Sequence, residues 1–364
     1  MDWQDEYERK KITVNQVFEQ YLTGNQKIYT GGLHVPTTII NALIDRVATG
    51  TLTGIDLYGN WMNGDITFAG LDVTPEQFRY HTYFAGPNER TGFANGSKCV
   101  AHIPVHFSDT NRMLEEVGLD YAVVQMTPPD AQGNCNIGPL GFEQGALRGA
   151  KHIIAQINPR LPRVFGDSHN YHVSTIDAFV MQEELLEDVQ VPAPTPEEAK
   201  VAEFIVNRVN DGDTIQLGFG GTINALASEL KGKRHLGIHT EALSDAGMEL
   251  LRSGAADNSR KTLHPGRTVT CFTMGSQALY DFIDDNPAFL HKTLSYTNNP
   301  SVLAAHPGMT SINAALQIDL TGQCASEGLG TRHISGSGGQ VDTSVGAQMA
   351  PGGKSIITPV SYTH

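Results

Sequence analysis

The same local pattern occurs twice in this chain, and this repeat constrains the fold more strongly than any other feature of the sequence. In each half, an apolar segment leads into a glycine turn, a segment with helical periodicity and a second short apolar segment. Residues 28–43 align without gaps on residues 215–230, so that Gly31 corresponds to Gly218. A strand, turn, helix and strand unit that is used twice predicts two related open α/β domains. The alternative is that two unrelated βαβ units resemble each other by chance at their beginnings.

A proline-rich segment separates the two halves. Prolines occupy alternate positions from residue 192 to residue 196, and prolines so spaced cannot continue a helix or a central strand. Thr195 is placed to cap a helix over residues 197–209, with Pro196 at its first position. We expect one face of this helix to carry Val201, Phe204, Ile205 and Val209. The predicted organisation is an N-terminal domain at residues 1–190, a linker at 191–196 and a C-terminal domain at 197–364.

Charge and composition exclude several classes of partner. Lys and Arg number 25 against 39 Asp and Glu, a net charge of −14, and no basic cluster offsets it, so nucleic acid is not expected as a partner. Apolar runs such as residues 121–124 fall far short of the roughly 20 residues of a membrane span. The charged N-terminus lacks the apolar region of a signal peptide. Four scattered cysteines without a CxxC pair fit a reducing compartment, so we expect a cytoplasmic protein without a membrane partner.

The glycine turn of the second half is a candidate binding element. Its sequence, Gly-Phe-Gly-Gly at residues 218–221, lies between an apolar strand and a predicted helix N-terminus. Backbone N–H groups at such a place are unpaired and favour an anion or a developing oxyanion. The spacing is not GxGxxG, which disfavours a nicotinamide-dependent oxidoreductase. A purely structural turn is the alternative.

Glu241 is the candidate catalytic residue. It lies at the end of the second apolar segment of the C-terminal half. Ligands of open α/β sheets bind at the carboxyl ends of strands, close to glycine turns of this kind. Tyr58 occupies the corresponding position of the first half, so only one half presents a carboxylate there. An ordinary surface glutamate is the alternative.

A second glycine-rich segment, residues 335–342, has no bulky side chain before Gln340. It would let an extended or polyanionic ligand lie against the backbone, and a flexible linker is the alternative. Apolar residues at 312–320 and 355–357 flank it, which favours a loop between strands.

Two further groups of residues have simpler interpretations. His102 and His106 have the spacing of a helical zinc pair, but Pro104 lies between them and the pattern is that of a strand or turn, so we expect no metal there. The basic run at residues 231–235 could meet a phosphate, although a solvated turn that closes the preceding helix fits better.

Together, the segments around Glu241, residues 218–221 and residues 335–342 resemble the acetyl-CoA hydrolase/transferase family. Within it, the chain is similar to the 4-hydroxybutyrate and butyryl-CoA:acetate CoA-transferases. Matching segments also lie at residues 127–133, 136–138, 296–298 and 312–319, so the resemblance covers nearly the whole chain. It implies an α/β fold of two tandem related open α/β domains, class I CoA-transferase-like and NagB/RpiA-like, with the active site between them.

The resemblance also marks two departures. Family members continue well beyond residues 352–355, whereas this chain stops at His364. The resemblance therefore implies a chain truncated at the C-terminus, with an incomplete second domain. Thr343 stands where the family usually has an aromatic residue.

Site residues follow from the same resemblance. The nucleophilic glutamate of the family falls on Glu241. Residues 93–96 and 102–107 of the first domain would help to wall the acyl pocket. The family's CoA contacts fall on Gly218, Phe219, Gly220, Gly221, Thr222, Leu316 and Gly339.

The implied activity is that of an acyl-CoA:carboxylate CoA-transferase in acetyl-CoA and short-chain fatty acid metabolism. Ionised Glu241 would attack an acyl-CoA, pass through an anhydride to a glutamyl-CoA thioester, and transfer CoA to a carboxylate such as acetate. N–H groups of Gly339 and of the turn at Gly220 and Gly221 would stabilise the oxyanions. CoA is a co-substrate in this chemistry, and no permanently bound cofactor or metal is required.

Two alternatives use the same residues. With water as the acceptor, the chain would be an acyl-CoA hydrolase. If the shortened C-terminus removes activity, it would be an inactive CoA-binding fragment. The resemblance further implies a homodimer or homotetramer.

Overall fold

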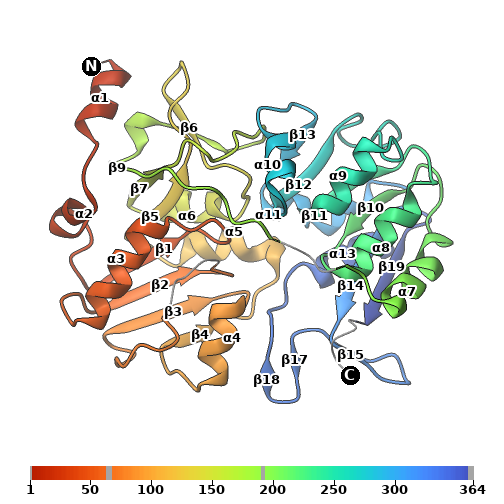
Figure 1. Ribbon diagram of the computed structural model, residues 1–364, viewed down its shortest axis with the longest axis horizontal. Coiled ribbons are helices and arrows are strands. Elements are labelled where there is room, and N and C mark those ends of the chain that lie inside the picture. The colour runs from red at the N-terminus through yellow and green to blue at the C-terminus, as the bar shows by residue number, and fades with distance from the viewer. Residues whose placement is uncertain (1, 63–67, 190–192, 360–364) are drawn as a thin grey trace.

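The structure, a computed structural model, describes residues 2–62, 68–189 and 193–359. It contains two α/β domains, each built on one parallel sheet, and they lie next to each other along the longest axis of the molecule (Figure 1). The prediction of two tandem open α/β domains is confirmed. The linker residues 191 and 192 lie outside the described residues, and the exact domain boundaries stay a prediction.

The first domain is formed around a seven-stranded sheet in the order β4-β3-β2-β1-β5-β7-β9. Its strands are β1 (Gln26–Thr30), β2 (Ile55–Gly59), β3 (Phe78–Thr82), β4 (Val100–His102), β5 (Tyr121–Met126), β7 (His152–Ile157) and β9 (Ala178–Met181). Its helices are α1 (Trp3–Arg9), α2 (Val14–Gln20), α3 (Thr37–Ala48), α4 (Pro87–Ala94), α5 (Phe107–Glu116), α6 (Glu143–Gly149) and the 3-10 helix η1 (Val173–Thr175). A separate antiparallel pair joins β6 (Asn134–Asn136) to β8 (Asn170–His172).

The second domain is formed around a six-stranded sheet in the order β13-β12-β11-β10-β14-β19. Its strands are β10 (Thr214–Leu217), β11 (Gly237–Leu243), β12 (Thr268–Thr273), β13 (Phe289–His291), β14 (Thr310–Ala315) and β19 (Lys354–Pro359). Its helices are α7 (Pro196–Val206), α8 (Gly221–Leu230), α9 (Asp245–Arg252), α10 (Gln277–Ile283), α11 (Leu294–Thr297), α12 (Pro300–Ala304) and α13 (Gln340–Met349). Two small hairpins pair β15 (Gln317–Ile318) with β16 (Cys324–Ala325) and β17 (Gly328–Leu329) with β18 (Arg332–His333).

The repeated unit of the sequence is the centre of each sheet. In the first domain β1 and β2 pair in parallel around α3, and in the second β10 and β11 pair in parallel around α8. The apolar residues predicted for these strands and helices are buried, Ile28 and Leu43 in one half and Ile215 and Leu230 in the other. Parallel strands covered by helices bury both faces, which explains their nearly continuous apolar character.

The helix after the proline-rich segment begins as predicted and ends earlier. Thr195 is its N-cap: its hydroxyl accepts a hydrogen bond from the Glu198 N–H, and its own N–H donates to the Glu198 carboxylate. The helix ends at Val206 rather than Val209. Its buried face is the narrow stripe of Ala202 and Ile205, so the prediction for Phe204 is wrong, because this side chain is 67% exposed.

A loop of the first domain that contains Arg163 and Phe165 forms hydrogen bonds with the second domain. Arg163 donates its backbone N–H to the Asp284 carboxylate at 2.7 Å and accepts a hydrogen bond from the Asp285 N–H at 2.8 Å. Two residues later, the Phe165 carbonyl accepts from the His291 N–H at 2.7 Å. Backbone bonds of this kind fix the angle between the two sheets.

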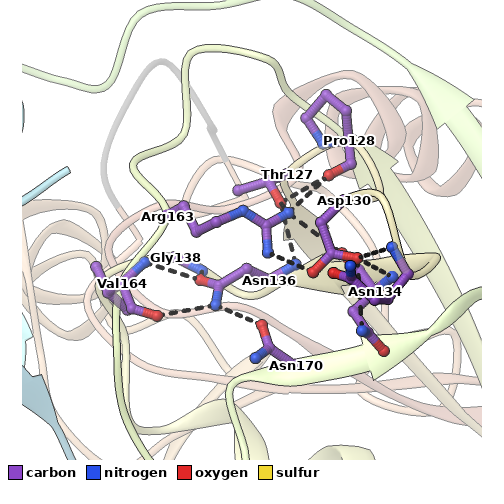
Figure 2. Close-up of polar contacts among 10 residues, drawn as sticks. Thr127, Pro128, Asp130, Asn134, Asn136, Gly138, Arg163, Val164 and Asn170 are labelled. Carbon is purple, nitrogen blue, oxygen red and sulfur yellow. Dashed lines mark hydrogen bonds and ion pairs between the residues drawn. The ribbon is translucent and has the colours of Figure 1, made fainter. Parts of the chain in front are cut away.

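Polar side chains hold this loop in place (Figure 2). The Arg163 guanidinium donates to the Thr127 hydroxyl at 2.9 Å and to the carbonyls of Pro128 and Asn134 at 3.0 and 3.2 Å. The buried Asn136 side chain accepts from the N–H groups of Gly138 and Val164 and donates to the Val164 carbonyl. The segments at residues 127–133 and 136–138, singled out in the sequence, therefore support the domain interface.

Among the helices of the described residues, none has the length and apolar character needed to cross a membrane.

Candidate active site

Two adjoining cavities lie between the domains, at the carboxyl ends of β10, β11 and β14. The smaller has a volume of about 180 Å3 and is lined by Glu241; the larger has a volume of about 600 Å3 and is lined by the glycine turn at the start of α8. Because the two cavities share part of their lining, they form one continuous site. The shared residues are Trp61, Phe84, Gly218, Phe219, Ala314, Ser326 and Ser335.

Glu241 projects from β11 into the smaller cavity, as the position at the end of a central strand predicts. Its Oε2 accepts a hydrogen bond of 2.5 Å from the side-chain amide of Asn298, which follows α11. The carboxyl group retains partial access to the cavity, so a ligand can reach it.

Burial raises the pKa of Glu241 to about 7, since desolvation disfavours the charged form of a carboxyl. The amide of Asn298 opposes this effect, because a donor stabilises the carboxylate, and the nearby charge of Asp342 raises the pKa further. A carboxyl that is half ionised near neutral pH in a cavity is a functional-site candidate on physical grounds.

Gly339 completes the surroundings of this carboxyl. It lines the smaller cavity and is the N-cap of α13. A Cβ atom at this position would overlap both Glu241 Oε2 and the Asn298 amide. Only glycine fits at this distance. Residues 335–339 line the smaller cavity, and their contact with a ligand stays a prediction.

The glycine turn at the start of α8 borders the larger cavity. Gly220 has φ of +125°, a conformation that favours glycine, and is the N-cap of the helix. A Cβ atom on Gly221 would overlap the Glu198 carboxylate. The cavity lining includes every residue that the sequence assigned to this turn and to the neighbouring strand end, namely Gly218, Phe219, Gly220, Gly221, Thr222 and Leu316.

The structure thus brings all the predicted site residues to one continuous site, but divides them between its two parts. Glu241 and Gly339 line the smaller cavity, and Gly220 and Gly221 line the larger one without lining the smaller. Their individual roles stay predictions.

The first-domain wall differs from the one predicted. Neither residues 93–96 nor residues 102–107 line these two cavities. They support the wall from behind: the ring of Phe93 packs edge-on against His333, and Phe107 donates its N–H to the Gly338 carbonyl at 3.0 Å. The prediction placed these two segments in the cavity lining, whereas they lie behind it. A sequence pattern does not distinguish residues that line a cavity from residues that pack behind the lining.

Trp61 and Phe84 form the wall instead. Their rings are stacked with centroids 5.5 Å apart, and both residues border both cavities. Trp61 has φ of +40°, a strained conformation for a large side chain. A Cβ atom on Gly86 would overlap the indole, so glycine at that position allows the ring to lie where it does.

Aromatic rings continue from this wall across the domain interface. The centroids of successive rings lie 5.0–5.5 Å apart, and the last ring belongs to β12 of the second domain. Such contacts stabilise the interface and keep the smaller cavity apolar on that side. The rings are those of Trp61, Phe84, Phe107, Phe142 and Phe272.

Polar residues form the opposite side of the smaller cavity. Asn313 of β14 donates to the hydroxyls of Ser311 and Thr343, at 2.9 and 3.0 Å, and Gln216 accepts from the Ser311 hydroxyl at 2.9 Å. Thr343 is buried. The threonine that departs from the family pattern is therefore a hydrogen-bond partner of a cavity residue.

Sequence reasoning missed Asn298, Trp61 and Phe84. Residues 296–298 contributed to the resemblance, but no local signal marks Asn298 as the partner of a residue 57 positions away. Trp61 and Phe84 follow β2 and β3, and the general rule that ligands lie beyond the carboxyl ends of parallel strands could have placed them near the site.

The corresponding turn of the first domain is filled by side chains of the protein. A Cβ atom on Gly32 would overlap the Asn60 side chain, and one on Gly31 would lie 3.4 Å from Glu143 Oε1. Asn60 and Glu143 are almost completely buried, and burial raises the pKa of Glu143 to about 8. The two repeated turns therefore occupy equivalent places, after β1 and after β10, but have different surroundings.

Within residues 2–62, 68–189 and 193–359, no group of three or more His, Cys, Asp or Glu side chains is arranged to hold a metal ion. His102 lies against His333, with ring centroids 4.2 Å apart, and His106 is the N-cap of α5.

Two family models match the chain: the acetyl-CoA hydrolase/transferase N-terminal domain over residues 1–190 and the C-terminal domain over residues 275–364. The chain is 34% identical over 362 residues to the 4-hydroxybutyrate coenzyme A transferase of Clostridium kluyveri, which covers 98% of this chain and 82% of that protein.

Solved structures agree with this similarity. The crystal structure of RipA from Yersinia pestis has a TM-score of 0.89 at 31% identity, covering 98% of this chain and 83% of that one. The 4-hydroxybutyrate CoA-transferase of Porphyromonas gingivalis has a TM-score of 0.80 at 27% identity, covering 98% and 82%. These alignments span nearly all of this chain and 82–83% of the length of each of these relatives.

Proposed function

Because the chain belongs to the acetyl-CoA hydrolase/transferase family, we propose that it is an acyl-CoA:carboxylate CoA-transferase that works through a glutamyl-CoA thioester on Glu241. The substrates are a short-chain acyl-CoA of the 4-hydroxybutyryl or butyryl type and acetate. One observation carries the proposal: the Glu241 carboxyl lies in a small cavity against the backbone of Gly339, next to a larger cavity that is bordered by a glycine turn.

The sizes of the two cavities support this assignment. The larger, about 600 Å3, is apolar for most of its surface and suits the extended pantetheine arm of CoA. The smaller, about 180 Å3, suits a short acyl group between the stacked rings of Trp61 and Phe84 and the polar side chains of Gln216 and Asn313. A polar wall of this kind also offers hydrogen bonds to a terminal hydroxyl.

In the first half-reaction, ionised Glu241 attacks the thioester carbonyl through one carboxylate oxygen. The carbon–sulfur bond breaks, which leaves an acyl-glutamyl anhydride and CoA thiolate. The thiolate then attacks the glutamyl carbonyl, so that a glutamyl-CoA thioester forms and the first carboxylic acid leaves as its anion. The incoming acetate repeats these steps in reverse and leaves as acetyl-CoA, which restores the Glu241 carboxylate.

Each step passes through a tetrahedral oxyanion. A backbone N–H that is fixed in place stabilises such an anion by several kcal/mol, roughly a factor of 10²–10³ in rate. We assign this role to Gly339, which lies against the Glu241 carboxyl. The amide of Asn298 holds the carboxyl by a hydrogen bond to Oε2, which leaves Oε1 as the attacking atom.

Water must be kept away from both covalent intermediates, because either would hydrolyse. The apolar wall of Trp61, Phe84, Phe272 and Met274 around Glu241 serves this purpose. It also explains why a transferase, rather than a hydrolase, is the function we propose for the same carboxyl.

The test compares CoA exchange in the parent, Glu241→Gln and Glu241→Ala, with Glu249→Gln as the control. Glu249 is an exposed carboxylate of α9 that pairs with Lys231. We expect acetate-dependent exchange in the parent and the control, and loss of exchange in both Glu241 variants. After incubation with acyl-CoA and reduction by borohydride, mass analysis should find a modified Glu241 only where exchange occurs. CoA release at the full rate without acetate would contradict a transferase and favour hydrolysis.

A further inference from the structure

His239 lies two residues before Glu241 on β11. Alternate residues of a strand project to the same face of a sheet, so His239 and Glu241 both face α11, while Thr240 faces the opposite side and bonds the Leu217 N–H. His239 is completely buried, and its Nε2 lies 2.9 Å from the carbonyl oxygen of Thr297. A carbonyl oxygen only accepts hydrogen bonds, so Nε2 carries a proton and donates it.

The Thr297 carbonyl, which accepts the hydrogen bond from His239, belongs to the peptide group between Thr297 and Asn298. On the other side of that peptide, the Asn298 N–H donates to the Leu294 carbonyl at 2.9 Å. The Asn298 side chain then donates to Glu241 Oε2. The helix α11 spans four residues, too few to fix its own C-terminal end by cooperative hydrogen bonding.

We propose that His239 is a positioning residue: through the Thr297 carbonyl, it fixes the peptide from which the Asn298 amide reaches the Glu241 carboxylate. This inference rests on the proposed function for its effect on catalysis, although the hydrogen-bond chain itself lies in the structure. In this proposal His239 acts through Asn298 and does not itself contact the substrate.

The surroundings keep His239 neutral, so that it can act as a fixed donor. Burial lowers its pKa, and the charge of Lys261 and the neighbouring rings of His306 and His264 lower it further. The groups that face Glu241 are Asn298, Asp342 and Cys271. Burial lowers the pKa of Lys261 to about 7, so this ammonium titrates in the same range as Glu241, and the ionisation of Glu241 has to be followed at its own carboxyl carbon.

Loss of the His239 bond should release Asn298 and raise the pKa of Glu241. The experiment compares His239→Asn with His239→Gln. A glutamine amide reaches the place of the imidazole Nε2, whereas an asparagine amide is too short to reach the Thr297 carbonyl. His306→Asn is the control: His306 packs on His239 with ring centroids 5.2 Å apart, and neither of its ring nitrogens has a hydrogen-bond partner among the described residues.

The primary measurement is the carboxyl titration of Glu241 by carbon-13 NMR in glutamate-labelled protein, with the signal assigned from Glu241→Gln. In His239→Asn we expect the titration midpoint to rise by about one pH unit. In His239→Gln and His306→Asn it should stay within a few tenths of the parent. Thermal unfolding of each variant establishes that it is folded.

CoA exchange provides the second measurement. In His239→Asn, kcat at pH 7 should fall about fivefold while KM changes little, because a pKa that rises by about one unit from about 7 reduces the ionised fraction of Glu241 by about that factor. The deficit should shrink as the pH rises, since a higher pH ionises the carboxyl in the variant as well. A deficit that is equal at every pH, or a titration midpoint that does not move, would overturn the inference. If the parent shows no exchange, the proposed function fails, and the titration still decides whether His239 positions Asn298.

Discussion

Asp342 of α13 accepts two hydrogen bonds from Ser108 of α5, one from its backbone N–H at 3.0 Å and one from its hydroxyl at 2.8 Å. This pair connects the two domains next to the loop of residues 335–339, since Asp342 lies three residues after Gly339. The negative charge of Asp342 also raises the pKa of Glu241. The Asp342 carboxylate thus contributes both to the contact between the domains and to the ionisation of Glu241.

Asp342→Asn should therefore move the acid limb of the pH–rate profile to lower pH by a few tenths of a unit. Removal of a negative charge stabilises ionised Glu241, so its pKa falls. The measurement is kcat/KM for acyl-CoA from pH 5 to pH 9. Asp281→Asn, at an exposed position of α10, changes the net charge equally and should leave the profile unchanged. A shift to higher pH would contradict the proposed effect of charge.

Gly339→Ala should reduce CoA exchange by about 100-fold, because the added methyl group would displace the Glu241 carboxyl and the Asn298 amide and small displacements of reacting groups have effects of this size. Gly70→Ala is the matched control, since within the described part of the chain no atom other than those of its two chain neighbours lies within 4 Å of a Cβ at that position. Steady-state kinetics at saturating acyl-CoA, together with thermal unfolding, separate a local effect from loss of the fold. Full activity in Gly339→Ala would exclude close approach of this backbone to the nucleophile.

The rate of the first half-reaction should rise with pH through an apparent pKa of about 7, because the proposed mechanism requires the ionised Glu241 carboxylate and burial raises the pKa of this group to about 7. Stability should change in the opposite direction. Between about pH 4.5 and pH 7 the folded chain binds more protons at this group than the unfolded chain, so this contribution to stability is lost as the pH rises. Glu241→Gln should accordingly have a higher Tm than the parent at pH 8 and an equal Tm near pH 4, measured by calorimetry.

Phe84→Leu should broaden the acyl-chain range. The ring of Phe84 forms one wall of the smaller cavity, and a leucine leaves additional space there. We expect the ratio of kcat/KM for hexanoyl-CoA to that for butyryl-CoA to rise about tenfold. Phe93→Leu serves as the control, because Phe93 packs on His333 outside both cavities. An equal change of the ratio in both variants would mean that the effect arises from loosened packing rather than from the cavity wall.

Arg163→Met should destabilise the protein by about 1–3 kcal/mol, because it removes the guanidinium hydrogen bonds to the Thr127 hydroxyl and to the carbonyls of Pro128 and Asn134, together with the ion pair to Asp130. Arg160→Met is the comparison: this exposed side chain pairs with Glu183 on the surface and should contribute less than about 1 kcal/mol. Urea denaturation of both variants measures the difference. Equal stability of the two would show that the contacts in Figure 2 contribute little.

The sequence alone predicted those parts of the fold that depend on local patterns. The strand and helix periodicity around Gly31 and Gly218 placed the centres of both sheets, and the cap at Thr195 marked a helix start. Glu241 was found because a carboxylate at the end of a central strand is recognisable by position. Asn298 and Trp61 were not found, because their places depend on how α11 and the loop after β2 pack against other elements. Phe204 was misplaced, since helical periodicity does not show how wide the buried face of a helix is.

The two repeated glycine turns differ in what they enclose. At Gly31 and Gly32, the side chains of Asn60 and Glu143 lie against the turn, whereas Gly218 and Gly220 border the larger cavity. The turn of the first domain is therefore filled by side chains, and the turn of the second domain borders an accessible cavity. Smaller residues in place of Asn60 and Glu143 would hollow out a second chamber at the equivalent point, a starting place for engineering a new ligand into the same scaffold.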